Sequence, residues 1–287
     1  MKGPSTAVSM IEEYVSIDMP PIACSVLLER ILISNGTHTL DDAQEIAARW
    51  NPRFKHLTQI KLNNEEKNDQ ISTIEFNRIN DDYVQGSCYI DSACSENEAE
   101  AKRLRSNKIH YVNAFRNISD IEFETTSSRI LSLWRVEKDF VTRRSADQGI
   151  DFYGRVPFGQ IIKPSAIGNG AEKQLKIWLV GQAKNYSATQ VSTKDLRELV
   201  GSVSLARSKC YAGSKDPLSE LDMRICDPVF FLFFTTGNIS RDARDLLKKT
   251  GVIAMDGSQL ATFLADHGIG LVNQVFDLER FRSWAGI

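Results

Sequence analysis

The sequence predicts an α/β fold for the C-terminal part of the chain, with a mixed central sheet and helices on both of its faces. Two observations lead to this fold class. Short apolar runs have the length of buried strands, and helix-capping signatures open segments whose apolar residues recur at helical spacing. Strands that alternate with helices are typical of a sheet covered on both faces. The predicted elements, in order, are a helix at 119–134, strands at 139–142, 150–153 and 174–186, a helix from 192, a strand at 229–234, a helix from 240, a strand at 252–255 and a helix at 260–267.

The first of these helices begins with a capping box, in which Ser119 and Glu122 bond each other's unpaired backbone amides. Capping accounts for Glu122, whereas Glu124 borders the apolar face and has no such explanation. The residues of that face are Phe123, Ser127, Ile130, Leu131 and Trp134.

Three strand candidates follow this helix. The second, at 150–153, begins at the end of the segment 147–151, which reads Asp-Gln-Gly-Ile-Asp. The third carries Gln-Ala-Lys directly after an apolar run and a glycine. The intervening segment 157–173 contains prolines and glycines, so a long loop or an extended hairpin tip is predicted there.

The later elements also have clear boundary signals. Ser192 and Asp195 form a capping-box-like start, and Ser240 caps a helix that Gly251 ends. The strand at 229–234 is apolar throughout and is predicted to be buried. The predicted buried face of the helix from 192 consists of Leu196, Leu199, Val200 and Val203.

Residues 1–115 predict a smaller N-terminal domain that is mainly α or α+β. A helix is predicted at 22–33, ended by the Asn-Gly pair that follows it. A second helix, capped by Thr39 or Asp41, is expected to stop at 51–52, because the proline there cannot donate a hydrogen bond to the preceding turn.

A basic and aromatic segment follows the second helix and includes Arg53 and Lys55. Two short helices followed by such a turn suit a helix-turn-helix or winged-helix module. An ordinary basic loop after a helix is the alternative. The polar residues 63–69 are expected to form a loop, and 95–108 a solvated connecting helix with a glutamate and a lysine one turn apart.

Composition narrows the function classes. The formal net charge is -2, so a DNA-binding groove must come from local clusters of lysine and arginine. The five cysteines form no Cys-x-x-Cys pair and the four histidines are scattered. This distribution argues against a zinc site and favours a reducing compartment.

No segment predicts secretion or membrane insertion. The first four residues lack the apolar core of a signal peptide. The apolar run at 229–234 is far too short to span a bilayer. We therefore expect a cytoplasmic protein without a membrane partner.

Three polar side chains are predicted to meet at one edge of the sheet. If the second and third strands are neighbours, Asp151, Gln182 and Lys184 can lie close together. Gln182 and Lys184 are two residues apart and therefore point to the same face of the sheet. A carboxylate, an amide oxygen and an ammonium at this edge predict a site for a hard cation with a lysine beside it.

Residues 120–268 contain an ordered set of five motifs. The set consists of Asp-x-Gly-Ile-Asp ending at Asp151, Gln-Ala-Lys ending at Lys184, Arg-Glu-Leu-Val-Gly ending at Gly201, Phe-Thr-Thr-Gly ending at Gly237, and Met-Asp-Gly-x-x-Leu ending at Leu260. This set resembles the catalytic domain of the Mrr-like restriction endonucleases. These enzymes belong to the PD-(D/E)xK nuclease superfamily, in the variant that has glutamine in place of the second acidic residue.

The resemblance implies a restriction-endonuclease-like core and a Mg²⁺-dependent DNA endonuclease, with Mn²⁺ as an alternative ion. Asp151 matches the metal-binding aspartate, and Gln182 and Lys184 match the Gln-x-Lys pair. Glu124 matches a glutamate of the family's first helix that helps to bind metal, and the backbone carbonyl of Ala183 would lie near the ion. Lys184 would orient or help to deprotonate the attacking water. The long span between the two strands departs from the family pattern and leaves their pairing open.

On this basis we expect residues 116–287 to form the nuclease catalytic domain and residues 1–115 to recognise the target by sequence or by base modification. Double-stranded DNA is the expected partner, and cleavage of both strands predicts a homodimer. The candidate DNA contacts are Lys194, Arg197, Asn185, Arg53 and Lys55.

Other interpretations of these residues stay open. Asp151 could simply begin a strand after a glycine turn, Lys184 could be a solvated edge lysine, and Glu124 a surface helix residue. Asp147 matches a recurring position of the family but also suits a turn. Two other functions are compatible with the sequence: a nuclease-like DNA-binding subunit that does not cut, and a junction-resolving or repair nuclease.

Overall fold

The computed structural model describes residues 3–35, 38–137, 139–142, 149–157, 176–186, 189–210 and 218–287. Contacts between residues divide the chain into two units, Met1–Asn107 and Lys108–Ile287. The sequence places a domain boundary near residue 115, and the assignment of separate functions to the two parts stays a prediction.

The N-terminal unit consists of helices and a small antiparallel sheet, in agreement with the predicted α+β character. The sheet has the strand order β1-β3-β2, and β3 pairs with both neighbours. The elements of this unit are α1 (Pro4–Ser9), α2 (Ile11–Tyr14), β1 (Ile22–Ala23), α3 (Cys24–Asn35), α4 (Leu40–Lys67), β2 (Ile74–Phe76), β3 (Tyr83–Gly86) and α5 (Glu96–Arg105).

Apolar side chains of α1, α3, α4 and the sheet form one core. The predicted helix at 22–33 corresponds to α3 but begins two residues later, because Ile22 and Ala23 pair with β3 as a short strand. The α3 residues buried in this core recur at helical spacing and are Cys24, Leu27, Leu28, Ile31 and Leu32.

The second predicted helix does not stop at Pro52. It forms α4, a single helix of 28 residues that Thr39 caps and that contains Pro52 in its interior. A proline at such a position costs about 3 kcal/mol. Packing offsets this cost, since Phe54 and Thr58 in the following turns are buried. The predictions of a basic turn after two short helices and of a loop throughout 63–69 are therefore wrong, and the argument for a helix-turn-helix module built on that turn no longer holds.

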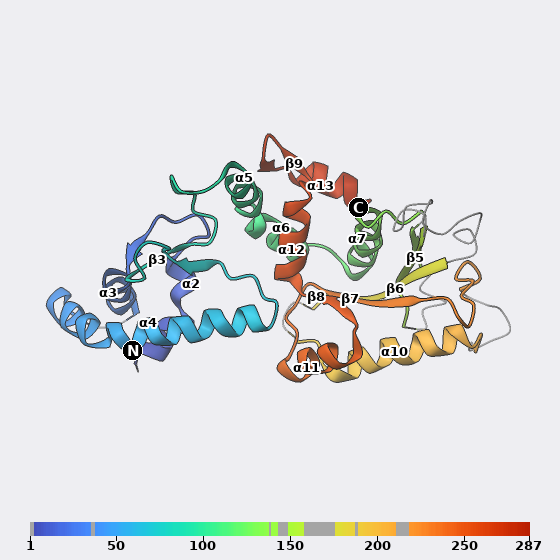
Figure 1. Ribbon diagram of the computed structural model, residues 1–287, viewed down its shortest axis with the longest axis horizontal. Helices are drawn as coiled ribbons and strands as arrows, with labels where there is room; N and C mark the ends of the chain where they lie inside the picture. The colour runs from blue at the N-terminus through green and yellow to red at the C-terminus, as the bar shows by residue number, and fades with distance from the viewer. Residues whose placement is uncertain are drawn as a thin grey trace. The chain divides into compact units, whose positions relative to one another are not determined.

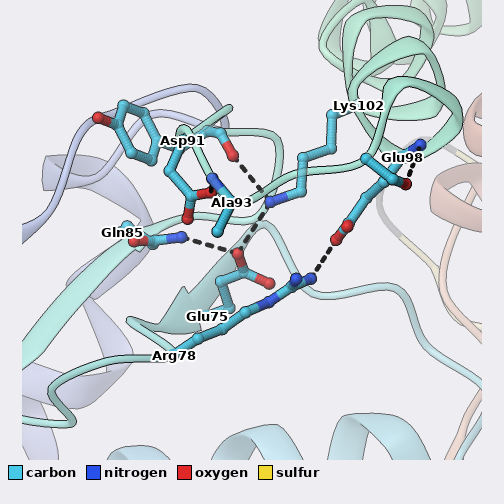
Figure 2. A network of polar contacts seen from close by, with 9 residues as sticks. Glu75, Arg78, Gln85, Asp91, Ala93, Glu98 and Lys102 are labelled. Atoms are coloured by element: carbon cyan, nitrogen blue, oxygen red, sulfur yellow. Dashed lines mark hydrogen bonds and ion pairs between the residues drawn. The ribbon is translucent and has the colours of Figure 1, made fainter.

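Helix α5 is exposed along much of its length, as its charges predict, but the lysine of its predicted intrahelical pair is buried. The Lys102 side chain is 9% exposed and lies 3.2 Å from the Glu75 carboxylate of β2. Its ammonium also donates a hydrogen bond of 2.7 Å to the carbonyl of Tyr89 (Figure 2). The same carboxylate accepts a hydrogen bond of 2.9 Å from Gln85 of β3. Lys102 therefore anchors α5 to the sheet of this unit.

A second ion pair joins α5 to the segment after β2. Glu98 pairs with Arg78 rather than with the lysine one turn farther along the helix (Figure 2). Both charged residues of the predicted intrahelical pair thus bind groups outside the helix.

The C-terminal unit is built on a five-stranded sheet of order β4-β5-β6-β7-β8. Strands β4, β5 and β6 pair antiparallel, and β6, β7 and β8 pair parallel. The predicted α/β class with a mixed central sheet is confirmed. The elements of this unit are α6 (Lys108–Arg116), α7 (Asp120–Leu133), β4 (Asp139–Val141), β5 (Phe152–Pro157), β6 (Lys176–Lys184), α10 (Thr193–Arg207), β7 (Val229–Thr235), α11 (Arg241–Thr250), β8 (Ile253–Met255), α12 (Gly257–Asp266), β9 (Leu271–Val272), β10 (Val275–Phe276) and α13 (Leu278–Ala285).

Each face of the five-stranded sheet carries its own apolar core. Phe152, Leu179 and Phe234 of the sheet pack with α6, α7, α12 and α13 on one face. Val180 and Phe233 point the other way and pack with α10 and α11. Figure 1 shows α7 and α12 on the opposite side of the sheet from α10 and α11. The alternation of side chains along β6 and β7 therefore decides which helices each residue meets.

The predicted capping boxes at Ser119 and Ser192 are both present, and Gly251 ends α11 in the left-handed conformation. Two burial predictions are wrong. Val200 is 37% exposed, because the buried stripe of α10 is narrower than predicted. Phe230 is 47% exposed, since burial of β7 is complete only toward its carboxyl end.

The longest helix of the described residues, α4, has 28 residues and a negative mean hydropathy. Across the residues that the structure describes, no helix combines the length and apolar composition that crossing a membrane requires.

Candidate functional site

Strands β5 and β6 are neighbours, so the predicted pairing of these two runs is confirmed. Phe152 lies opposite Gly181, and a Cβ on Gly181 would come within 2.2 Å of the Phe152 ring. This close approach fixes the register of the two strands. It places Asp151, just before β5, beside Gln182 near the carboxyl end of β6.

Asp151 is held by backbone hydrogen bonds on both sides. Its amide donates to the carbonyl of Gly181 at 3.0 Å, and its carbonyl accepts from Thr142 at 2.9 Å. Its carboxylate oxygen Oδ2 accepts a hydrogen bond of 2.7 Å from the amide of Ala183. The side chain thus replaces a backbone acceptor at the end of the strand ladder, and the residue is only 5% exposed. A carboxylate is therefore fixed in this buried position by the fold itself.

Gln182 points toward α10 and is 1% exposed. Its Nε2 atom donates a hydrogen bond of 3.3 Å to Oε1 of Glu198 on α10. Its Oε1 atom is buried and has no hydrogen-bond partner among the described residues. An unpaired buried acceptor costs about 1–3 kcal/mol. Such an atom suggests a ligand that is not part of the protein chain.

Lys184 is the last residue of β6 and is half-buried. It lies on the same face as Gln182, because Ala183 between them packs into the core on the other face. Among the described residues, its ammonium has neither a hydrogen-bond partner nor an ion-pair partner. Lys184 thus follows Gln182 by two positions on one face of β6, at the strand end where the Asp151 carboxylate bonds the intervening amide of Ala183.

The turn before Asp151 depends on Gly149. This glycine has a φ of 79°, in the left-handed region that other residues adopt rarely. A Cβ at this position would lie 2.3 Å from Oγ of Ser202 and 3.7 Å from Nε2 of Gln182. The absence of a side chain therefore lets the turn pack directly against α10 and the glutamine.

Glu124 lies in the second turn of α7, on the other face of the sheet from α10. It is half-buried. The N-terminal end of α7 adjoins the carboxyl end of β6, since Asn185 donates a hydrogen bond of 2.9 Å to the carbonyl of Ile118. Glu124 therefore belongs to the helix whose N-terminal end lies at the edge of the sheet that carries the site. The role of Glu124 in metal binding stays a prediction.

A cavity of about 560 Å³ opens beyond the carboxyl ends of β6 and β7. Two glycines of the cavity lining pack closely against the backbone. A Cβ on Gly237 would lie 2.7 Å from a neighbouring carbonyl oxygen, and a Cβ on Gly257 would lie 2.2 Å from another. In sheets of this type, ligands bind at the carboxyl ends of parallel strands. The charged and polar residues of the cavity include Arg116, Asp120, Asn185, Tyr186, Thr236 and Ser258.

Tyr186 borders this cavity, and its hydroxyl donates a hydrogen bond of 3.0 Å to Asp195. Burial and the neighbouring carboxylate raise the pKa of Tyr186 to about 12. Although burial raises the pKa of Asp195, hydrogen bonds from Ser192 and Tyr186 hold that pKa below its usual value. The pair therefore links the site to the start of α10 as a neutral phenol and a carboxylate.

The predicted DNA contacts differ in how accessible they are. Lys194 and Arg197 are exposed on α10, and Arg53 is exposed on α4. Lys55 forms ion pairs with two aspartates, at 3.2 Å with Asp81 and 2.6 Å with Asp82. Its positive charge is therefore largely compensated within the protein.

Asn185, a further candidate for DNA contact, has its side chain engaged at both ends. Its Nδ2 bonds the carbonyl of Ile118, and its Oδ1 accepts a hydrogen bond of 2.8 Å from Thr236. These bonds hold three segments of the cavity wall together. The predicted turn residue Asp147, and the predicted loop at 157–173 apart from its first residue, lie outside the described residues.

The oxygen donors fit a hard divalent cation. Among the described residues, no group of three or more His, Cys, Asp or Glu side chains could hold a metal ion. The site instead offers the carboxylate of Asp151 and the unpaired amide oxygen of Gln182. Mg²⁺ is often bound by only one or two carboxylates, with water and substrate phosphates as its other ligands. The donor chemistry therefore suits this ion, although few protein ligands are available.

Glu198 is the residue that sequence reasoning missed. It belongs to the Arg-Glu-Leu-Val-Gly motif, where it follows the capping Asp195 by almost one turn. Only the packing of α10 on the sheet brings it within hydrogen-bonding distance of Gln182. The available signal was a carboxylate on the strand-facing edge of that helix.

No protein-family model matches the chain, and no curated protein sequence matches it. The solved structures that match this chain have low structural similarity to it. The restriction endonuclease MspJI in complex with a 27-mer oligonucleotide has a TM-score of 0.39 and 20% identity over 69% of this chain. The DNA modification-dependent restriction endonuclease AspBHI has a TM-score of 0.40 and 16% identity over 71%. Restriction endonuclease FokI bound to DNA has a TM-score of 0.31 and 13% identity over 92%.

This chain spans less than half the length of each of these structures, namely 40% of MspJI and 45% of AspBHI and FokI. At TM-scores below 0.5, the overlaps carry no argument about what this chain does.

Proposed function

We propose that the C-terminal unit is a Mg²⁺-dependent DNA endonuclease that hydrolyses phosphodiester bonds, with the Gln-x-Lys motif of the Mrr-like PD-(D/E)xK enzymes. The observation that supports this proposal is the convergence of Asp151, Gln182 and Lys184 at the end of the β5–β6 ladder. The groups are a fixed carboxylate and, among the described residues, an amide oxygen and an ammonium without protein partners. Such groups can bind a divalent cation and stabilise the charge that develops on a phosphodiester.

Asp151 and Gln182 would hold the metal through their side-chain oxygens, with the carbonyl of Ala183 nearby. Glu124 would add a second negative charge from the start of α7. When bound, a divalent cation would lower the pKa of a water molecule and neutralise charge on the phosphate. Mn²⁺ would serve in place of Mg²⁺, because both ions prefer oxygen ligands.

Lys184 would act on the reacting groups directly. Its ammonium would donate hydrogen bonds to the phosphate oxygens and orient the attacking water. In the reaction, the water oxygen bonds to phosphorus and the bond from phosphorus to one sugar oxygen breaks. The water protons end on the departing oxygen and in solvent, and the products are a phosphate monoester and a hydroxyl group.

The substrate proposal is double-stranded DNA, cut by a homodimer in a bacterial restriction or defence system. Lys194 and Arg197 would contact the phosphate backbone, since they are exposed on the helix next to the site. Residues 1–115 would recognise the target, and the exposed Arg53 would contact the DNA. Lys55 is a weaker candidate for this role because its two aspartate partners already compensate its charge.

The test is cleavage of plasmid DNA by the full-length protein with Mg²⁺, with EDTA as the control. The variant Asp151→Asn keeps an oxygen that can accept the Ala183 hydrogen bond but removes the charge. We expect cleavage by the natural protein with Mg²⁺, and loss of cleavage with EDTA and in the variant. Cleavage that persists in EDTA or in folded Asp151→Asn would contradict the proposal.

The same cleavage assay on unmodified, methylated, branched and single-stranded DNA distinguishes the possible substrates. Preference for a modified or unmodified duplex supports a restriction function. Preference for branched DNA would assign the same chemistry to junction resolution or repair. Binding without cleavage on every substrate would indicate a DNA-binding subunit instead.

A further inference from the structure

A glutamine in a metal site has a disadvantage that a carboxylate lacks. Its side chain ends in one oxygen and one NH₂ group, and only the oxygen can bind a cation. Either end can occupy the same space, so a rotation of the amide by half a turn would present hydrogen atoms to the ion. A metal site that contains Gln182 therefore needs a neighbouring group that keeps the amide oxygen, and not the NH₂ group, directed toward the cation.

Glu198 lies where its carboxylate can fix the orientation of the Gln182 amide. An ionised carboxylate only accepts hydrogen bonds, so it can bond the NH₂ end of the amide and not the oxygen end. The hydrogen bond from Gln182 Nε2 to Glu198 Oε1 is 3.3 Å long. The amide oxygen consequently points away from Glu198, and it is the atom that lies buried without a partner among the described residues.

This orientation of the Gln182 amide is unfavourable in free energy unless a cation binds its oxygen. Gln182 is 1% exposed, so its unpaired oxygen loses the hydrogen bonds with water that it would make on the surface. The reverse orientation would put the oxygen against a carboxylate, which repels it. The carboxylate of α10 thus holds the amide with its oxygen unpaired, an arrangement that a cation would stabilise.

We propose that Glu198 is a positioning residue that orients the Gln182 amide so that its oxygen faces a divalent cation. This inference rests on the proposed function, because it assumes that a cation binds beside Asp151. Glu198 also adds a negative charge close to the site, in the place of the carboxylate that position 182 lacks. Partners that orient metal ligands in this way typically contribute 10–100-fold to metal affinity.

The experiment measures Mn²⁺ binding to the full-length protein by isothermal titration calorimetry, with EDTA-treated protein and no DNA. Glu198→Asp keeps the charge but shortens the side chain, so a bond that is already 3.3 Å would be lost. Glu198→Gln can present its own NH₂ or oxygen to Gln182 and no longer selects one orientation. We expect each variant to weaken Mn²⁺ binding at least tenfold. The exposed Glu279 on α13 provides a matched control, and Glu279→Gln should leave binding unchanged.

Exchanging residues 182 and 198 distinguishes an orienting role of Glu198 from the mere loss of its carboxylate. In the double variant Gln182→Glu with Glu198→Gln, the inward group is a carboxylate, both of whose ends are oxygens. The amide at 198 can donate to one of them and leave the other for the ion. We expect Mn²⁺ affinity within a few-fold of the natural protein. Affinity as low as in Glu198→Gln alone would overturn the orienting role.

Two other outcomes are decisive. If the natural protein binds Mn²⁺ and Glu198→Asp and Glu198→Gln bind it equally well, Glu198 does not position the site and the proposed function is untouched. If the natural protein binds no Mn²⁺, with or without an added DNA duplex, both the orienting role and the metal-dependent function are contradicted. The amide resonances of Gln182 in a ¹⁵N spectrum give an independent check, because they should shift in Glu198→Asp and not in Glu279→Gln.

Discussion

The carboxylate of Asp151 accepts a hydrogen bond of 2.7 Å from the backbone amide of Ala183, which lies between Gln182 and Lys184 in the chain. This bond ends the β5–β6 ladder, so the carboxylate stabilises the fold at the position where the proposed chemistry needs a negative charge. Substitution can separate the hydrogen bond, which stabilises the fold, from the negative charge, which the proposed reaction needs.

Asp151→Ala should lower stability as well as activity. It leaves the Ala183 amide buried without an acceptor, which costs about 1–3 kcal/mol. Asp151→Asn keeps an acceptor and should stay within about 1 kcal/mol of the natural protein in urea denaturation. Both should lose cleavage. Equal stability of the Ala and Asn variants would mean that the bond to Ala183 contributes little.

Lys102→Met should destabilise the N-terminal unit. The substitution keeps the length of the buried side chain but leaves Glu75 and the Tyr89 carbonyl without their cationic partner. Removing one partner of a buried ion pair costs about 3–5 kcal/mol, and the half-buried Glu75 reduces this to about 2 kcal/mol. Denaturation followed by fluorescence measures the effect. A change below about 0.5 kcal/mol would show that the network in Figure 2 is not needed for stability.

Pro52→Ala should stabilise α4. Proline inside a helix costs about 3 kcal/mol, and part of this is offset by the smaller entropy of the unfolded chain. Because Pro52 is exposed, alanine adds no steric conflict, and we expect a gain of about 1–2 kcal/mol in the free energy of unfolding. A loss of stability would indicate that Pro52 itself is needed for the packing of α4.

Acid should weaken the start of α10 through Asp195. Hydrogen bonds hold its pKa in the folded protein below the unfolded value of about 3.9. A depressed pKa contributes stability above the unfolded value, and this contribution is lost as the pH falls through the folded value. Unfolding as the pH falls below about 4 should therefore depend less on pH in Asp195→Asn than in the natural protein. Identical pH profiles would contradict the role of Asp195.

Local signals predicted the order of elements in the C-terminal unit. The capping boxes at Ser119 and Ser192 rely on residues three positions apart, and the apolar strands are continuous runs, so neighbouring residues contain the information. Asp151, Gln182 and Lys184 could be grouped because the strand period fixes their faces.

The features that the sequence did not predict depend on distant contacts. Pro52 breaks isolated helices, and only the packing of Phe54 and Thr58 keeps α4 continuous. Lys102 is a typical surface residue until the strand that carries Glu75 folds beside it. The bond between Glu198 and Gln182 joins residues 16 positions apart on a helix and a strand.

The most direct test of the central claim compares two lysines of the same strand. Lys184→Met removes the ammonium at the carboxyl end of β6, and Lys176→Met removes an ammonium on the same face of β6 that pairs with Asp222 at 3.2 Å, away from the site. In single-turnover cleavage of duplex DNA with Mg²⁺, we expect Lys184→Met to reduce the rate at least about 100-fold without loss of stability. Lys176→Met should cut at the natural rate. Equal rates for the two variants would contradict the assignment of Lys184 to the reaction.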